Sequence, residues 1–141
     1  MVLKTRRREK DLGPKLPHSL LKLFAVAALL LVPWTILTAG LLPTKHLDQN
    51  WDVVWSGFDI GLLISLAATA YFGWRRSVWV VGAASSAGTF LLVDAWFDCV
   101  TAKDGLENIT SFSTAMLFEL PLALLAFWIA YHAGKYFFNK G

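Results

Sequence analysis

The stretch LFAVAALLLVPWTILTAGLLPT, residues 23–44, contains no charged side chain. A helix needs about 20 apolar residues to cross the roughly 30 Å hydrocarbon layer of a membrane, so this stretch predicts a transmembrane helix over about residues 20–42. Of the 141 residues in the chain, 56% are hydrophobic and only 16% are charged, whereas soluble domains are nearer a quarter charged. The composition therefore argues against a water-soluble globule, a disordered chain or a nucleic-acid-binding protein.

Three further apolar stretches predict transmembrane helices at residues 53–73, 77–100 and 112–134. Asp59 interrupts the second stretch, and Glu119 is the one acidic residue of the last. The connections between these stretches are short, which is typical of helices that pack against their neighbours in the chain with opposite direction. The predicted fold is all-α, an antiparallel bundle of four transmembrane helices.

Basic residues predict how the bundle lies in the membrane, because loops rich in Lys and Arg stay in the cytoplasm. Eleven of the 13 Lys and Arg residues fall in an N-terminal arm with the first turn after it, in the turn between the second and third helices, and in the tail. We therefore expect a basic cytoplasmic arm at residues 1–19, a cytoplasmic tail at residues 135–141, and a multi-pass protein of the cell membrane with both termini inside.

Acidic residues lie mainly on the opposite side, and three of them share one depth. With about 1.5 Å of rise per residue, Asp59, Asp94 and Glu119 all fall roughly 6 to 7 Å from the bilayer centre, in its outer half. Asp52 and Asp98 lie one to two turns nearer the outer surface. An ionisable side chain at such a depth is costly when it faces lipid, so these five residues are predicted to face the bundle interior or a wet cavity.

Aromatic and hydroxyl side chains are predicted beside the acids. Trp55 and Trp96, each close to an acidic residue, are candidate walls of a pocket for an organic cation, although Trp is also typical of the two interfacial belts of a membrane protein. Thr35 and Thr38 lie at a comparable depth and offer hydroxyl groups. Pro121 cannot donate a backbone hydrogen bond, which predicts a carbonyl oxygen near Glu119 without its usual helical partner.

The state of the clustered carboxyls is left open by the sequence. They are protonated, hold a cation, or remain solvated in an outer vestibule, and neighbouring carboxyls couple the first two states because proton and cation compete. The sequence identifies no cofactor, no specific metal and no catalytic residue. A single cysteine, Cys99, excludes a disulfide framework within the chain.

A resemblance to known proteins is carried by three elements: WDVVWSGFD at residues 51–59, DAWFD at residues 94–98 and ELP at residues 119–121. These elements resemble those of small four-helix integral membrane proteins of actinobacterial type whose function is not established. The resemblance implies a bacterial cytoplasmic membrane and implies no activity.

Three functions fit these features. The first is proton-linked or cation-linked binding or transport, with Asp59, Asp94 and Glu119 as ligands and with Asp52 and Asp98 at the entrance, in a monomer or a homo-oligomer. The second is a non-catalytic accessory or assembly subunit of a membrane complex, in which the acids make structural hydrogen bonds. The third is an intramembrane enzyme acting on lipid. The sequence favours a non-enzymatic role, because no nucleophile or oxyanion-stabilising group accompanies the carboxyls.

Overall fold

The computed structural model describes residues 13–41, 50–102 and 105–139, without the side chain of residue 107. The elements in these ranges are α2 (His18–Leu41), α3 (Trp51–Trp74), α4 (Trp79–Thr101), α5 (Leu106–Thr114), the π-helix η1 (Ala115–Glu119) and α6 (Leu120–Phe138). Four helices are long and apolar enough to cross a membrane, the last of them running through α5, η1 and α6. The prediction of an all-helical chain with four potential membrane spans is confirmed.

The first three spans begin and end within a few residues of their predicted bounds, whereas the fourth is longer. Its helix begins at Leu106, directly after Gly105 with its positive φ of 99°, and continues to Phe138. The apolar stretch in the sequence predicts this span only over residues 112–134. Those residues form a helix whose apolar side chains, Leu106, Ile109 and Phe112, are exposed on the outside. The many polar residues of Leu106–Thr114 therefore made the first turns of this helix unrecognisable as part of an apolar span.

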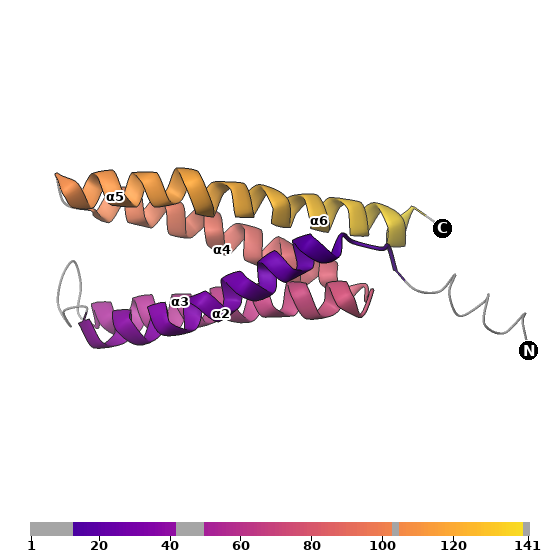
Figure 1. Cartoon of the computed structure of the whole chain (residues 1–141), viewed down its shortest axis with the longest axis horizontal. Coiled ribbons are helices and arrows are strands. Elements are labelled where there is room, and N and C mark those ends of the chain that lie inside the picture. The colour runs from indigo at the N-terminus through magenta and orange to yellow at the C-terminus, as the bar shows by residue number, and fades with distance from the viewer. Residues whose placement is uncertain (1–12, 42–49, 103–104, 140–141) are drawn as a thin grey trace, which may run out of the picture.

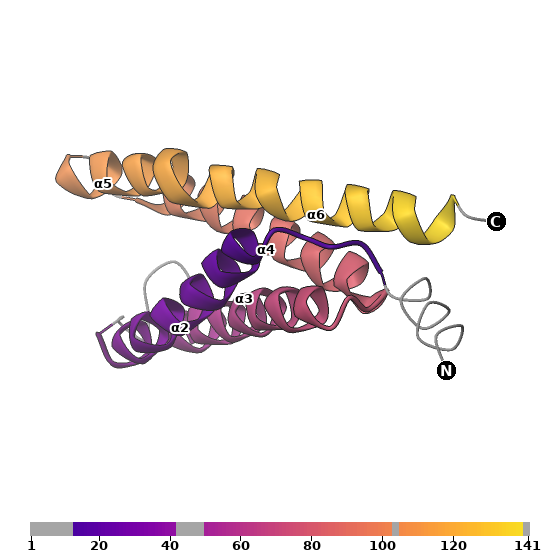
Figure 2. The same ribbon diagram turned by 45° about the vertical axis from the view of Figure 1, so that its right-hand side comes forward.

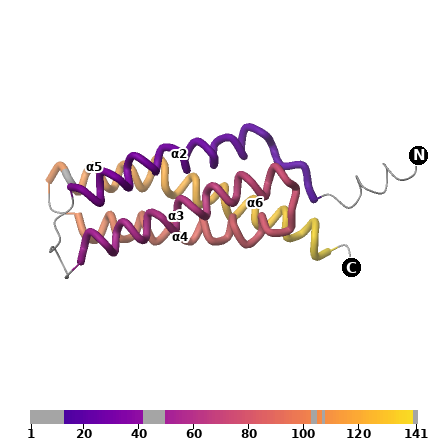
Figure 3. Tube along the Cα trace, turned by 90° about the horizontal axis from the view of Figure 1, so that it is seen from below, coloured from indigo at the N-terminus to yellow at the C-terminus, as the bar shows by residue number. Residues whose placement is uncertain are grey.

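The helices lie lengthwise beside one another, and the chain reverses direction at each connection (Figure 1). α2 packs on α3, α3 on α4, and α4 on η1 and α6. Figure 3 shows α3 and α4 running together. Among the described residues, no Cα atom of α2 lies within 8 Å of one in α5, η1 or α6. The backbone of the first span, α2, therefore does not pack closely on that of the last span, which comprises α5, η1 and α6.

The two ends of the molecule differ in how tightly they pack. We call the end with residue 13 and residue 139 the termini end, and the end where α2 finishes and α3 starts the far end. α2 lies nearest to α6 at the termini end and diverges from it toward the far end (Figures 1 and 2). Small buried residues allow α4 and α6 to approach closely toward the termini end: Ala84, Ala87, Gly88, Ala123, Ala126, Ala130 and Ala133. Sterically slim residues are the usual means of close helix packing in membranes.

The segment that precedes α2 is packed against the turn between α3 and α4. Gly13 donates its N–H to the Arg76 carbonyl at 3.0 Å, and Arg76 Nε donates to the Gly13 carbonyl at 2.6 Å. Gly13 and Leu16 are buried. Part of the basic arm expected over residues 1–19 therefore packs on the termini end of the bundle through Gly13 and Leu16. Residues 1–12 of that arm lie outside the described residues.

Arg76 also ends α3 by a Schellman motif. Its φ is 53°, and the N–H groups of Arg76 and Ser77 donate to the carbonyls of Gly73 and Phe72, respectively. Glycine is the usual residue in this left-handed position, because a side chain there costs on the order of 1 kcal/mol. The two hydrogen bonds with Gly13 offset that cost and hold the turn in place.

Candidate functional site: a carboxylate-lined cavity

A cavity of about 760 Å³ occupies the far half of the molecule and receives side chains from all four spans. Its wall contains acids, hydroxyls, aromatic rings and aliphatic side chains. The described residues that line it are Ala27, Leu30, Leu31, Trp34, Thr38, Trp51, Trp55, Asp59, Leu62, Leu66, Leu91, Asp94, Asp98, Thr101, Ala102, Thr110, Ser111, Thr114, Phe118, Glu119 and Leu122. None of these lining residues is a Lys, Arg or His.

Four of the five predicted acids meet in this cavity. Asp59 comes from α3, Asp94 and Asp98 from successive turns of α4, and Glu119 from the end of η1. These four carboxyls therefore come from three of the four spans and line one common space. Asp59 and Glu119 are buried, whereas Asp94 and Asp98 are half-buried. Ionised carboxyls in this largely apolar surrounding need a cation or water beside them, and protonation removes the charge instead.

Asp59 is held by a threonine of the neighbouring helix. It is only 3% exposed, and Thr38 on α2 places its Oγ1 atom 3.2 Å from Asp59 Oδ2. The same Oγ1 atom lies 2.7 Å from the Trp34 carbonyl. A hydroxyl has one proton, so Thr38 donates either to an ionised Asp59 or to its own helix. When Thr38 donates to the Trp34 carbonyl, its oxygen can accept a hydrogen bond from a protonated Asp59. The contact between Thr38 and Asp59 is therefore compatible with both the ionised and the protonated carboxyl.

Glu119 is brought inward by a local widening of its helix. Ala115–Glu119 form a π-helix in which the Leu120 N–H donates to the Ala115 carbonyl, five residues back. Pro121 follows directly and has no N–H, which disrupts the regular α-helical ladder at this point. Glu119 is 8% exposed, and its Oε2 atom is buried without a hydrogen-bond partner among the described residues. Such an orphaned oxygen is costly for the fold and suits a ligand.

An aromatic cluster makes the wall between α3 and α4. The ring of Trp55 meets those of Trp51, Phe58 and Phe97 edge to face, at centroid distances of 5.7, 6.0 and 6.1 Å. Phe58 in turn meets Phe90 at 5.2 Å. These contacts fix the orientation of Trp55 beside the acids, where the face of an indole ring attracts a cation.

Three predicted site residues lie outside the cavity lining. Trp96 is 68% exposed on the outer face of α4, because it is two residues, or about 200° of helix, from both Asp94 and Asp98. It is therefore not a wall of the pocket. Asp52 lies in the first turn of α3, between the lining residues Trp51 and Trp55, but does not itself line the cavity. The hydroxyl of Thr35 donates to the Leu31 carbonyl at 2.9 Å, within its own helix.

The structure adds lining residues that the sequence analysis did not assign to the site. Trp34 on α2 and Phe118 on η1 face the cavity from opposite sides, and Trp51 contributes beside Trp55. Thr110, Ser111 and Thr114 also line it, from the helical turns that had been assigned to a loop. A period of three to four in Leu106, Ile109, Phe112 and Met116, with hydroxyls on the other face, was the signal that marks these turns as an amphipathic helix.

The carboxyls share the cavity without converging on one ion. Within the described part of the chain, no group of three His, Cys, Asp or Glu side chains is arranged to hold a metal ion. A hard cation needs several oxygen ligands within about 2.0–2.6 Å. Asp59, Asp94 and Glu119, as the structure places them, therefore do not form the shared set of direct ligands for one ion that the sequence predicts.

Comparisons of this chain with protein-family models, with curated proteins and with solved structures find no match.

Proposed function

We propose that this protein is a multi-pass protein of the cell membrane whose cavity binds a cation in exchange for protons. The observation that carries the proposal is the buried, unpartnered Oε2 atom of Glu119, in a cavity with three further carboxyls and no cationic side chain among its described lining residues. The distribution of Lys and Arg supports an antiparallel bundle with both termini in the cytoplasm, which puts the far end and its acids in the outer half of the membrane.

The choice of an organic over a metal cation follows from the cavity. Quaternary ammonium ions are bound in proteins by aromatic faces together with nearby carboxylates, at distances that need no direct coordination. The cavity offers Trp34, Trp51 and Trp55 together with four acids. Tetramethylammonium is therefore the simplest probe of the site.

We expect tetramethylammonium binding to weaken as the pH falls. A protonated carboxyl no longer attracts the cation, and its proton must leave before the cation binds. For each proton released on binding, the affinity for the cation falls by up to about tenfold when the pH is lowered by one unit. Isothermal titration of the full chain in lipid nanodiscs from pH 8 to pH 5 measures this, and repeating one pH in buffers of different ionisation enthalpy counts the protons released. Absence of binding at pH 8, or an affinity independent of pH, would contradict the proposal.

The orientation has its own test. In a Cys99→Ser background, we expect Asn50→Cys to react with a membrane-impermeant maleimide on intact cells. Asn139→Cys should react only after the cells are permeabilised, because the positive-inside rule puts it in the cytoplasm. Labelling of position 139 on intact cells would reverse the topology and place the cavity in the cytoplasmic half.

A further inference from the structure

We infer that the cation bound in this cavity is a single-chain amphiphile, with its ammonium group among the carboxyls and its alkyl chain in the apolar half. This inference rests on the proposed cation binding and specifies the class of ligand. The cavity is divided along its length. The acids and hydroxyls lie toward the far end, whereas the part nearer the middle of the molecule is aliphatic, lined by Ala27, Leu30, Leu31, Leu62, Leu66, Leu91 and Leu122.

The dimensions of the two parts fit such a ligand. Leu66 lies seven residues beyond Asp59 on α3, so the aliphatic part extends about 10 Å deeper than that carboxyl. The total volume of about 760 Å³ lies within the range of roughly 300–1,000 Å³ that is usual for sites of small organic molecules. A compact ion would fill only the acidic part and would leave the aliphatic part without an occupant.

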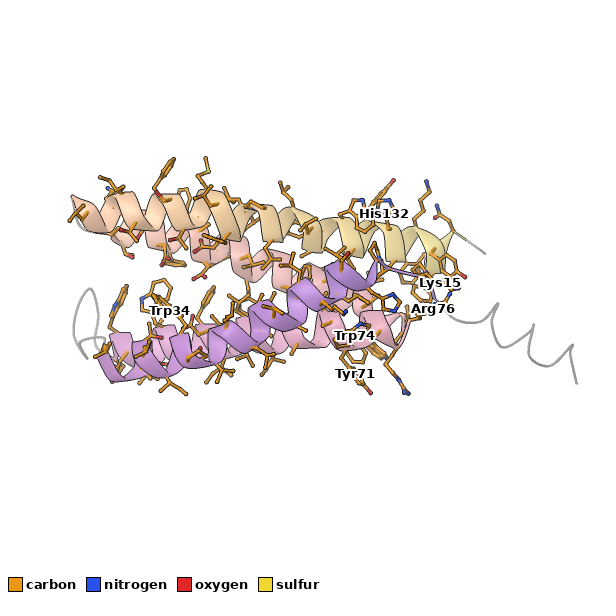
Figure 4. The ribbon with its side chains drawn as sticks, viewed as in Figure 1. Lys15, Trp34, Tyr71, Trp74, Arg76 and His132 are labelled. Carbon is orange, nitrogen blue, oxygen red and sulfur yellow. The ribbon has the colours of Figure 1, made fainter. Side chains whose placement is uncertain are left out.

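The side of the molecule offers a route by which an amphiphile in the membrane reaches the cavity. α2 makes no close backbone contact with α5, η1 or α6 in the described chain. Trp34 of α2 and Phe118 of η1 both line the cavity although they are 58% and 68% exposed, so the cavity is open at these two residues. Figure 4 shows Trp34 pointing from α2 into the space between the helices. In a bilayer this side faces lipid.

The orientation of a membrane amphiphile matches that of the cavity. An alkylammonium ion in a bilayer keeps its charged group toward the interface and its chain parallel to the helices. In the proposed topology the acids lie in the outer half of the bilayer, and the leucines lie deeper, around the bilayer centre, so the ammonium group sinks below the interface to reach the carboxyls. A ligand that moves sideways between α2 and η1 therefore reaches the carboxyls without turning over.

The test compares tetramethylammonium with n-octyltrimethylammonium, which share a head group and differ in chain. Both are titrated into nanodiscs with the full chain at pH 8, and nanodiscs with the Asp94→Asn/Glu119→Gln variant give the lipid partitioning to subtract. We expect the octyl compound to bind at least about tenfold more tightly, because two buried methylene groups already give that factor. Equal affinity of the two compounds would overturn the inference and leave the proposed function intact. Failure of both to bind would overturn the proposed function.

Variants that fill the aliphatic part separate the two halves of the cavity. Ala27→Phe is expected to abolish most of the advantage of the octyl compound and to leave tetramethylammonium binding within about twofold. The matched control is Ala39→Phe, an exposed position of α2 outside the lining, which should change neither affinity. Leu30→Trp fills the same region from a more exposed position and serves if Ala27→Phe does not fold. An unchanged octyl advantage in a folded filling variant would place the chain outside the cavity and contradict the inference.

Discussion

Replacing Asp94 by Asn together with Glu119 by Gln is expected to weaken tetramethylammonium binding at pH 8 by about 100-fold or more. Each change keeps the shape of the side chain and removes one negative charge from the cavity. At an effective dielectric constant near 20, a unit charge about 5 Å from the cation contributes roughly 3 kcal/mol, and tenfold in affinity corresponds to about 1.4 kcal/mol. Titration calorimetry in nanodiscs measures the loss directly.

Asp52→Asn is the matched control for this double variant. Asp52 lies seven residues before Asp59, on the same face of α3, but it does not line the cavity. Its replacement should change the affinity by less than about threefold, the effect of one distant, solvent-screened charge. If the double variant binds normally and only loses thermal stability, the acids are structural, as expected of a non-catalytic accessory subunit.

Gly13→Ala is expected to lower the free energy of unfolding by about 2–4 kcal/mol, among the largest effects of any single substitution that adds one methyl group. An added Cβ at this position would overlap the Phe137 ring and would lie 2.5 Å from the Arg76 carbonyl oxygen. The ring could turn away, but the carbonyl is backbone and accepts the Gly13 N–H. The substitution therefore forces this segment off the α3–α4 turn. Thermal unfolding in detergent measures the effect as a drop in Tm.

Gly82→Ala makes the same change where the chain has room. Apart from the residues next to it and the backbone of its own helix, no atom of the described residues lies within 4 Å of a Cβ built at Gly82, in the first turns of α4. Alanine is the better helix former by up to about 1 kcal/mol, so Tm should stay constant or rise slightly. A Gly13→Ala protein as stable as the Gly82→Ala protein would show that the segment before α2 is not fixed to the turn.

The two ends of the molecule differ in the size and polarity of the side chains between the helices, and this difference explains why the cavity lies toward the far end. Toward the termini end, alanines and glycines bring α4 and α6 together, and Leu21 and Phe24 of α2 are almost fully buried in the core. Toward the far end, the positions that face the space between the helices carry acids and tryptophans. These side chains are too polar or too large to pack into one dry core. The orphaned oxygen of Glu119 is the cost of this arrangement, because a stable fold alone would favour an apolar side chain there.

The sequence by itself determined the helical class and the four apolar spans, and it predicted one common level for Asp59, Asp94 and Glu119. Uncharged runs of about 20 residues and a fixed rise per residue are local properties, so they are readable without knowing how the helices pack. Helix periodicity alone also separates Trp96 from the face of Asp94 and Asp98, which makes Trp96 an outward-facing residue.

Only the tertiary structure decided which side chains share the cavity and how wide it is. The separation of α2 from α6, and the placement of Trp34 and Phe118 on one cavity, depend on contacts between helices distant in sequence. The packing of Gly13 against Arg76 likewise joins segments far apart in the chain. Hydrophobic runs specify that a helix crosses a membrane, but its rotation and its neighbours are set by the fit of side chains between helices.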